Sequence, residues 1–279
     1  MSTASKKEIL VPIDFSECSK NALINAIEMA RQWGFKLHLV HSYLMPAEAL
    51  VGAEVGNPYG TDTDHSRDVN YNFKKLIKEL PELKSVEYVK SLKLGRLSSV
   101  INDLAEKNDI ELVVMGTHGA RGMKELVMGS NTYNVIKNIQ LPVMIFPEKS
   151  GVLKIKRCAF LSGFENLEDP MAFQPFRDLV KRTNAEIDLI HFIKKDSLRV
   201  ELVRTNKLIL HIGDIRHSVH VSRDAALESD IHDYVLLYDI DLLVMMPKKH
   251  HFFEFLYGKE VWSEKLIFHT KTPLFVLPH

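Results

Sequence analysis

The feature that most restricts the fold of this chain is a set of four short apolar segments that occurs twice, in the same order. The matching pairs are Glu8–Ile13 with Arg157–Leu161, Leu37–His41 with Ile187–His191, Asp109–Met115 with Asp239–Met245, and Leu141–Pro147 with Thr272–Pro278. Repetition on this scale indicates two related domains, and 279 residues is a comfortable length for two. We place the boundary at the short junction around Ser150, which gives domains 1–149 and 150–279.

Within each half, the apolar segments have the lengths of strands and alternate with stretches of helical periodicity. In the first half, Leu23 and Ala26 share one helical face, and Ser16 is placed to cap that helix. Val86–Lys90 is predicted to be the third strand, whereas Arg199–His211 is compatible with either helix or strand. Strands that alternate with helices imply right-handed crossovers and a parallel sheet covered on both faces. The predicted fold class is therefore α/β, with two tandem domains that each contain an open parallel sheet flanked by helices.

The charge balance and the hydropathy of the chain disfavour several classes of protein. Lys and Arg together number 36, as do Asp and Glu, so the net field attracts neither nucleic acid nor an anionic membrane. No apolar run approaches the roughly 20 residues of a membrane helix, and the N-terminal residues lack the apolar core of a secretion signal. Cys18 and Cys158 are too few for a disulfide framework. We therefore expect a cytoplasmic protein that binds neither nucleic acid nor membrane.

A glycine-bearing segment follows the apolar run Leu112–Met115 and precedes a helical pattern. Its residues are spaced as Gly116-x2-Gly119-x9-Gly129-Ser130. Glycine lets a phosphate approach the backbone without a Cβ clash, and the start of a helix supplies free N–H donors. The segment is neither a Walker A loop, since no Lys follows the glycine, nor a G-x-G-x-x-G dinucleotide loop. We interpret it as a phosphate-binding loop rather than as a turn shaped only by its glycines.

Three segments that are remote in the sequence are expected to converge on one site. In open parallel sheets, ligands bind outside the carboxyl ends of the strands, at the switch point of the strand order. Asp14, the segment after His41 and the loop from Gly116 each follow a predicted strand. The stretch 44–65, rich in Gly and Pro, follows the same edge, and a loop of this length is usually functional or mobile.

The residues at this edge resemble the universal stress protein family in its tandem two-domain form. The resemblance rests on Val-Pro-Ile-Asp-Phe-Ser at 11–16, Val-Val-Met-Gly-Thr-His-Gly at 113–119, Gly129-Ser130, and Leu-Pro-Val at 141–143. It covers the first half of the chain well and the remainder more weakly. It implies Rossmann-like domains of the HUP type, each with five parallel strands. The complete G-x2-G-x9-G-[S/T] pattern is that of the ATP-binding branch of the family, so we expect ATP, with or without Mg²⁺, in the first domain.

The same resemblance implies roles for individual residues. Asp14 is expected to contact the ribose or adenine side of the nucleotide, and Pro12 belongs to the same binding segment. Backbone groups near Ser42 are expected to flank the base, with Met115 and Gly116 beneath it. The residues expected to hold the phosphates are Gly119, Gly129, Ser130 and Asn131.

The second copy departs from this pattern. Met246 and Lys249 stand at the positions of Gly116 and Gly119, and most of the loop glycines are lost. Ser162-Gly163-Phe164 replaces the turn that carries Asp14 in the first copy. Bulky side chains are expected to fill the equivalent space. We therefore predict one nucleotide site per chain, in the first domain.

The function that the resemblance implies is regulation in a stress response. It also implies that the two domains pair through their last strands, Val143–Phe146 and Leu274–Leu277, and that two chains associate further as a homodimer. A protein partner is expected but not identified by the sequence. A phosphotransferase would need a placed base and metal ligands, and no spacing here demands them, so we predict no catalytic residue and favour a binder over an enzyme. The alternatives are a slow ATPase or autophosphorylating phosphotransferase, and a nucleotide-free interaction scaffold.

Two further residue types have quieter interpretations. His217 and His220 would point to opposite faces of a strand, and no carboxylate or Cys completes a metal-binding set, so we predict no metal site. Cys18, close to a helix start, is a candidate redox sensor, but a partly buried, unreactive thiol is the preferred interpretation.

Overall fold

The computed structural model describes residues 6–44, 62–117, 130–148, 150–162, 170–192, 198–222, 233–246 and 272–278. Its strands are β1 (Glu8–Pro12), β2 (Lys36–Tyr43), β3 (Tyr88–Leu94), β4 (Ile110–Gly116), β5 (Val143–Phe146), β6 (Arg157–Ser162), β7 (Glu186–Phe192), β8 (His217–Ser222), β9 (Leu242–Met245) and β10 (Leu274–Val276). The α-helices are α1 (Glu17–Trp33), α3 (Asp62–Glu79), α4 (Leu97–Ala105), α5 (Ser130–Asn138), α6 (Gln174–Thr183) and α7 (Leu198–Ile212). Short 3-10 helices, η2 (Pro81–Ser85) and η3 (Pro170–Phe173), complete these elements.

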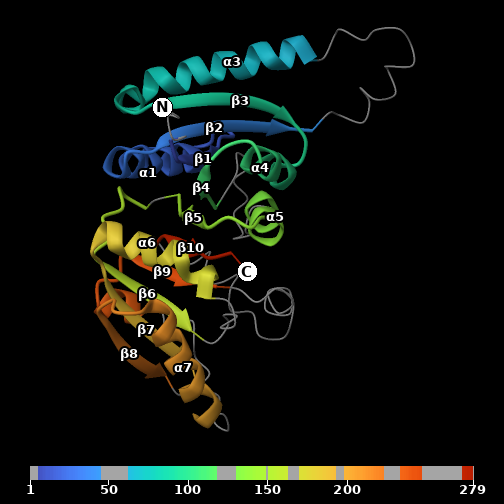
Figure 1. Cartoon of the computed structure of the whole chain (residues 1–279). Helices are drawn as coiled ribbons and strands as arrows, with labels where there is room; N and C mark the ends of the chain where they lie inside the picture. The colour runs from blue at the N-terminus through green and yellow to red at the C-terminus, as the bar shows by residue number, and fades with distance from the viewer. Residues whose placement is uncertain are drawn as a thin grey trace, which may run out of the picture.

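The described strands form one sheet that runs through the whole molecule (Figure 1). Its strand order is β3-β2-β1-β4-β5-β10-β9-β6-β7-β8. Read inward from each outer edge, the two halves therefore follow the same order, β3-β2-β1-β4-β5 and β8-β7-β6-β9-β10. Neighbouring strands are parallel within each half, whereas β5 and β10 are antiparallel where the halves meet.

The junction of the halves is the pairing of the last strand of each. The paired residues are Val143 with Val276, Met144 with Phe275, and Ile145 with Leu274. This agrees with the expectation that these two strands join. The predicted α/β class and the parallel sheet with flanking helices are also confirmed, although the sheet is continuous rather than divided in two. The assignment of 1–149 and 150–279 as separate domains stays a prediction.

Buried apolar side chains form two layers, one on each face of the sheet. The layer that contains α1 also includes side chains of α3, α6 and α7, such as Phe73, Phe176 and Leu208. The layer that contains α4 also includes side chains of α5 and of residues 233–237, such as Val135 and Val235. Each layer therefore draws on both halves of the chain. We call them the α1 layer and the α4 layer.

Burial on both faces explains why the first strand is continuously apolar. Ile9, Leu10 and Val11 are all fully buried. Ile9 and Val11 belong to the α1 layer and Leu10 belongs to the α4 layer, as the alternation of side chains along a strand requires. A strand of this kind cannot lie at a wet surface, so β1 takes a central place between β2 and β4.

Helix α1 begins and ends with the caps that its sequence predicts. The Ser16 hydroxyl accepts a hydrogen bond from the Ser19 N–H at the start. Gly34 adopts φ 71° after the last turn, and its N–H donates to the Ala30 carbonyl. The helix α6 ends in the same way at Asn184, with φ 53°, because Asn tolerates the left-handed region better than most residues.

One side chain of α6 ties the second half to the first. The Arg182 guanidinium lies 4.8 Å from the ring centre of Phe35 and 5.7 Å from that of Trp33. It also pairs with the Glu111 carboxylate at 2.9 Å. Because Trp33 and Phe35 flank the end of α1 and Glu111 lies on β4, this arginine adds a polar and aromatic contact beside the strand junction.

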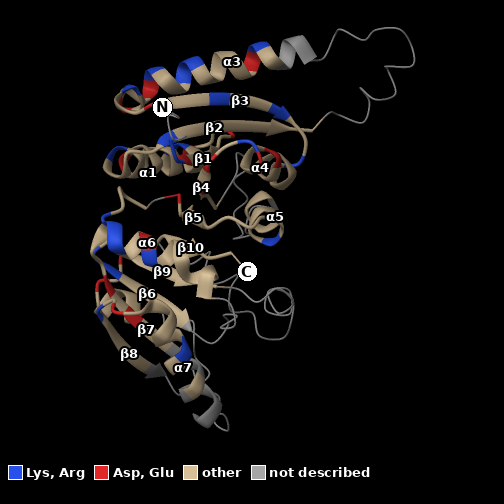
Figure 2. Ribbon diagram, in the orientation of Figure 1, with Lys and Arg blue, Asp and Glu red and all other residues tan. Residues whose placement is uncertain are grey.

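The charges of the molecule are mixed rather than segregated. Figure 2 shows Lys and Arg interspersed with Asp and Glu along α3, as the equal totals of the sequence predict. None of the described helices is both long enough and apolar enough to cross a membrane.

Candidate functional site

The sheet brings the ends of β1, β2 and β4 side by side at one edge. β1 lies between the other two strands, with Leu10 level with Val113 of β4 and Pro12 level with Val40 of β2. The Ile13 N–H continues the pairing by donating to the Val40 carbonyl at 2.8 Å. The residues that follow these strands therefore share one edge, as expected from the sequence. We call this the carboxyl edge of the first half.

The residues predicted to contact the base and the ribose of a nucleotide lie at this edge, and they differ in how exposed they are. Asp14 is exposed, whereas Pro12, Ser42 and Gly116 are partly buried. Met115 is buried in the α4 layer, so it supports the edge from below. The structure thus brings together five residues from three remote segments.

Asp14 shapes the turn that leads from β1 into α1. Its Oδ1 accepts hydrogen bonds from the Ser16 N–H at 3.0 Å and from the Ser16 hydroxyl at 2.6 Å. Ser16 in turn caps α1 by accepting from the Ser19 N–H at 3.2 Å. The carboxylate therefore has a structural role in addition to any role toward a ligand, and sequence reasoning did not predict this role.

Phe15, between these two residues, has a left-handed backbone with φ 64°. Its ring lies 5.2 Å from the His41 ring and 5.1 Å from the Phe73 ring, measured between centres. His41 is fixed by a 2.7 Å hydrogen bond between its Nδ1 and the Ile13 carbonyl, which places the ring proton on Nδ1 because a carbonyl only accepts. Sequence reasoning missed this pair of rings. An aromatic residue inserted between an Asp and a helix-capping Ser is the signal that could have found it.

Gly116, at the end of β4, packs directly against the first turn of α1. A Cβ at this position would lie 2.5 Å from the Sγ of Cys18 and 2.8 Å from its carbonyl oxygen. Cys18 is buried, in agreement with the quieter interpretation of this thiol, and its Sγ lies 3.8 Å from the Phe146 carbonyl oxygen. The glycine is therefore required by the packing of helix on strand, whether or not a ligand lies above it.

The two ends of the glycine-bearing loop are anchored to each other. The Thr132 hydroxyl donates to the Gly116 carbonyl at 3.1 Å, and the Thr117 N–H donates to the Phe146 carbonyl at 3.2 Å. Both threonines are buried. The start of α5 is thereby held against the end of β4, which is the arrangement that a helix needs to aim its first N–H groups at an anion beside the sheet.

Part of the predicted phosphate-binding set lies outside the described residues. This applies to Gly119 and Gly129. Ser130 is the first residue of α5, and Asn131 in its first turn is exposed. Phosphate binding by these four residues stays a prediction.

The second half fills the position that corresponds to Gly116. Ile9 pairs with Leu112 in the first half, and Cys158 pairs with Leu242 in the second, so Met246 is the counterpart of Gly116. Its side chain is fully buried in the α1 layer. This is the bulky replacement that the sequence predicts. The neighbouring predicted substitutions, at Gly163, Phe164 and Lys249, lie outside the described residues.

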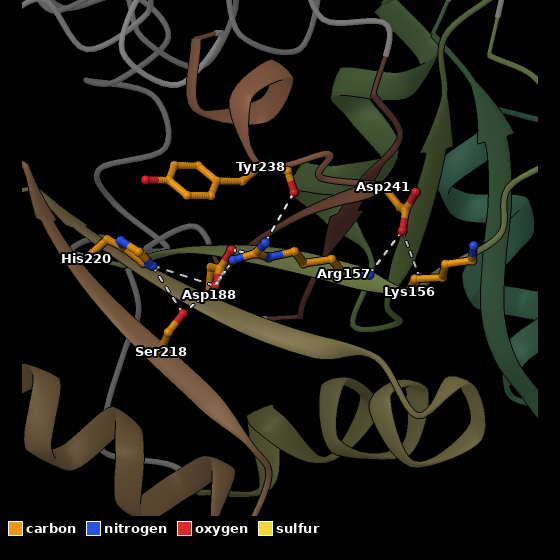
Figure 3. A network of polar contacts seen from close by, with 7 residues as sticks. All are labelled: Lys156, Arg157, Asp188, Ser218, His220, Tyr238 and Asp241. Atoms are coloured by element: carbon orange, nitrogen blue, oxygen red, sulfur yellow. Dashed lines mark hydrogen bonds and ion pairs between the residues drawn. The ribbon is translucent and has the colours of Figure 1, made fainter.

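A polar network lies in the second half, where Arg157 and Asp188 are close to the amino ends of β6 and β7, and Ser218 and His220 are on β8 (Figure 3). Arg157 donates to both oxygens of the buried Asp188, at 2.7 and 3.1 Å, and Ser218 also donates to that carboxylate. The Arg157 guanidinium lies 5.3 Å from the Tyr238 ring centre, and His220 lies 3.1 Å from the Ser218 hydroxyl.

In this network the negative charge of Asp188 is balanced by the positive charge of Arg157. Burial acts to raise the pKa of Asp188, but hydrogen bonds from Arg157 and Ser218 outweigh it and hold the pKa below its usual value. The hydrogen bond to Asp188 raises the pKa of Arg157. The network therefore pairs a buried carboxylate with a partly exposed guanidinium and is best explained as structural.

The strand order, with helices in the connections between parallel strands, defines a Rossmann-like α/β protein. The chain belongs to the Universal stress protein family, whose sequence profile matches residues 6–147. The Universal stress protein MJ0531 of Methanocaldococcus jannaschii is 27% identical over 139 residues, which cover 50% of this chain and 81% of that protein.

Solved structures extend the comparison to the second half. A universal stress protein from Archaeoglobus fulgidus superposes on 98% of this chain and 96% of its own, with a TM-score of 0.71 at 17% identity. The two proteins therefore share their fold over nearly the whole length. A universal stress protein solved in complex with cAMP covers 51% of this chain and 97% of its own, at 19% identity and a TM-score of 0.38.

Proposed function

We propose that this protein is an ATP-binding regulator with one nucleotide site, at the carboxyl edge of its first half. The observation that carries the proposal is the contrast between equivalent strand ends. Gly116 is partly exposed at the end of β4, whereas Met246 at the equivalent place in the second half is fully buried. A ligand can contact the backbone of a strand end only where that backbone is exposed.

The described residues around Gly116 support a nucleotide in particular. The exposed Asp14 carboxylate offers an acceptor for ribose hydroxyls, and it sits on a turn held by its own hydrogen bonds. The Thr132 contact holds the start of α5 beside the same edge, where free N–H groups favour phosphate. The spacing Gly116-x2-Gly119-x9-Gly129-Ser130 fits the ATP-binding pattern, with Pro12, Ser42, Met115 and Asn131 completing the proposed set.

The second half serves, in this proposal, as an internal partner. Residues 1–149 and 150–279 would be two domains whose last strands join as two subunits of a dimer join, and the antiparallel β5–β10 pairing supports this. Association of two chains into a homodimer, a role in a stress response and a cytoplasmic location belong to the same proposal.

Calorimetric titration of the full chain tests the proposal. We expect ATP, with Mg²⁺ present or absent, to bind at one site per chain, and cAMP and GTP to report which part of the nucleotide is recognised. Gly119→Val should abolish the heat of binding by placing a branched side chain in the loop, whereas Lys249→Ala, at the equivalent place in the second half, should leave it unchanged. Absence of heat and of any thermal shift at millimolar ATP would reject the site and favour the interaction scaffold.

Turnover distinguishes the binder from the enzyme. Purified protein is incubated with ATP and Mg²⁺, and released phosphate and phosphorylated protein are measured over time. We expect stoichiometric binding with neither product. Turnover that disappears in Ser130→Ala, in protein with unchanged thermal stability, would instead establish an ATPase or an autophosphorylating enzyme.

A further inference from the structure

Three adjacent strands of the first half align an acid, an imidazole and a hydroxyl. Glu8 lies on β1, His38 on β2 and Ser91 on β3. The Glu8 Oε2 is 3.0 Å from His38 Nδ1, and His38 Nε2 is 2.8 Å from Ser91 Oγ. Glu8 opens β1, whereas Ser91 is level with Val40 of β2 and, through Val40, with Pro12 of β1. The Ser91 hydroxyl therefore lies two residues, roughly 7 Å along the strand, before the level of Ser42 at the carboxyl edge.

The order of the groups is the one that activates a nucleophile. A carboxylate only accepts hydrogen bonds, so the proton of the neutral imidazole lies on Nδ1 and Nε2 is left as an acceptor. Ser91 then donates its hydroxyl proton to Nε2, which is the relation between a nucleophilic serine and its general base. The second Glu8 oxygen is held by the Lys36 ammonium at 3.0 Å. The carboxylate, and with it the ring, is thereby fixed in orientation.

The members of the group differ in burial: Glu8 and His38 are shielded from solvent, whereas Ser91 is not fully buried. The Glu8 and His38 side chains are 5% and 6% exposed. Ser91 is only partly buried, and β3 is the edge strand of the described sheet. Val89, on the same side of β3, is exposed and offers an apolar contact for a short acyl chain.

The edge strand also offers a backbone donor beside Ser91. The Leu37 N–H donates to the Glu87 carbonyl and the Gly95 N–H donates to the Tyr43 carbonyl, so the odd-numbered residues of β3 direct their polar backbone groups at β2. In a parallel ladder the intervening residues direct theirs the other way. The Leu92 N–H, next in sequence to Ser91, therefore faces the outer edge of the sheet. A backbone N–H in this place can stabilise an oxyanion that forms at Ser91.

The second half provides an internal comparison, because its register places Arg157, Asp188 and His220 at the positions of Glu8, His38 and Ser91. There the hydroxyl of Ser218 donates to Asp188 and accepts from His220, so its proton is committed to a carboxylate. Arg157 neutralises that carboxylate. The order that favours nucleophilic attack is thus absent at the equivalent described positions of the second half.

We propose that Ser91, with His38 as general base and Glu8 as a positioning residue, reacts with esters of short acyl chains. Ser91 Oγ forms a bond to the acyl carbon as the ester C–O bond breaks, and His38 passes the serine proton to the leaving alkoxide. Water then attacks the acyl-serine, His38 takes a proton from that water, and the proton returns to Ser91 Oγ. The products are a carboxylic acid and an alcohol, with no change of oxidation state.

The test is covalent labelling of the full chain with a fluorophosphonate, located by peptide mass spectrometry, together with hydrolysis of p-nitrophenyl acetate. We expect one adduct, on Ser91, and we expect labelling and hydrolysis to be lost in Ser91→Ala. His38→Gln should slow both by about 100-fold, the usual contribution of a positioned base. Ser85→Ala, which removes an exposed serine bonded to the Glu82 carbonyl, and Ser218→Ala should change neither.

Two further readouts separate catalysis from structure. Glu8→Gln should shift the pH midpoint of p-nitrophenyl acetate hydrolysis, which a loss of folded protein alone would not move. Millimolar ATP should leave labelling of the wild-type chain unchanged, so failure of the nucleotide site does not affect this test. Absence of a Ser91 adduct on the folded wild-type chain would overturn the proposal, as would equal labelling of wild type and His38→Gln.

Discussion

Gly116 lies so close to Cys18 that a methyl group on Gly116 would sit 2.5 Å from the Cys18 Sγ and 2.8 Å from the Cys18 carbonyl oxygen. This contact sets the distance between the end of β4 and the first turn of α1. Gly116→Ala must displace one of them, and we expect it to lower the free energy of unfolding by about 1–3 kcal/mol. Urea unfolding followed by circular dichroism measures the loss.

Cys18 supplies the control for this prediction. Cys18→Ala removes the sulfur but leaves the carbonyl oxygen in place, so the double variant Cys18→Ala, Gly116→Ala should regain only part of the lost stability. Unchanged stability of Gly116→Ala alone would contradict the packing. Weakened nucleotide binding by a Gly116 variant would not by itself show that Gly116 contacts the ligand.

At most positions an alanine variant is more stable than a glycine variant, but the left-handed backbone of Phe15 should reverse this order. Phe15→Ala and Phe15→Gly both remove the ring contacts with His41 and Phe73. Only the glycine variant also relieves the left-handed backbone at φ 64°, a cost of about 1 kcal/mol for residues with a Cβ. We therefore expect Phe15→Gly to have the higher unfolding midpoint of the two. Equal midpoints, or a more stable alanine variant, would show that the turn relaxes without cost.

Much of the fold could be predicted because its signals are local and repeated. Continuous apolar runs such as Ile9–Val11 indicate strands buried on both faces, and Gly34 marks the end of α1. The strand predicted at Val86–Lys90 lies instead at Tyr88–Leu94, because every residue of this edge strand is exposed or only partly buried and its apolar pattern is weak. Arg199–His211 falls within a helix, α7, which its periodicity alone did not decide.

The candidate site was predicted only in part. Topology places Asp14, Ser42 and Gly116 together, because parallel strands end at the same edge. The close approach of Gly116 to Cys18 could not be predicted, since it depends on the distance between a helix and a strand. The alignment of Glu8, His38 and Ser91 was missed for the same reason, because it depends on the register of three strands.

Asp14 can be tested for ligand contact separately from its role in the turn. Asparagine keeps the Oδ1 acceptor that binds the Ser16 N–H and hydroxyl, but it removes the charge. We expect Asp14→Asn to retain the thermal stability of the ligand-free protein and to weaken ATP binding by about tenfold, as the loss of a charge-assisted hydrogen bond would. Calorimetry and thermal unfolding without nucleotide measure the two effects.

Asp14→Ala completes this comparison. It removes the turn acceptor as well as the charge, so it should lower the free energy of unfolding by about 1 kcal/mol and weaken ATP binding at least as much. If Asp14→Asn binds ATP with the affinity of the wild type, the carboxylate serves the turn alone.

The ion pair of the buried Asp188 with the partly exposed Arg157 makes the free energy of unfolding depend on pH in a predictable direction. The pKa of Asp188 is lowered in the folded state, so the folded protein binds fewer protons than the unfolded chain at low pH. The pair's contribution is complete above the unfolded pKa, about 4, and is lost as the pH falls through the lower folded pKa. Near neutral pH, Asp188→Asn should lower the free energy of unfolding by about 2 kcal/mol, because it removes the charge-assisted hydrogen bonds from the partly exposed Arg157 guanidinium.

Urea unfolding of the wild type and Asp188→Asn at a series of pH values from neutral to acid tests whether the pair's contribution to the free energy of unfolding falls with pH. The difference between the two proteins should be constant above about pH 5 and should shrink as the pH falls below about 4, because the Asp188 carboxyl of the unfolded chain then binds a proton that the folded protein does not. Glu186→Gln is the matched control on the same strand, since its side chain is 58% exposed and pairs with Arg216 at 3.7 Å. We expect it to change the free energy of unfolding by less than about 0.5 kcal/mol at every pH. If the difference in the free energy of unfolding instead grew as the pH fell, the pKa of Asp188 would be raised in the folded state. The pairing with Arg157 would then not set that pKa.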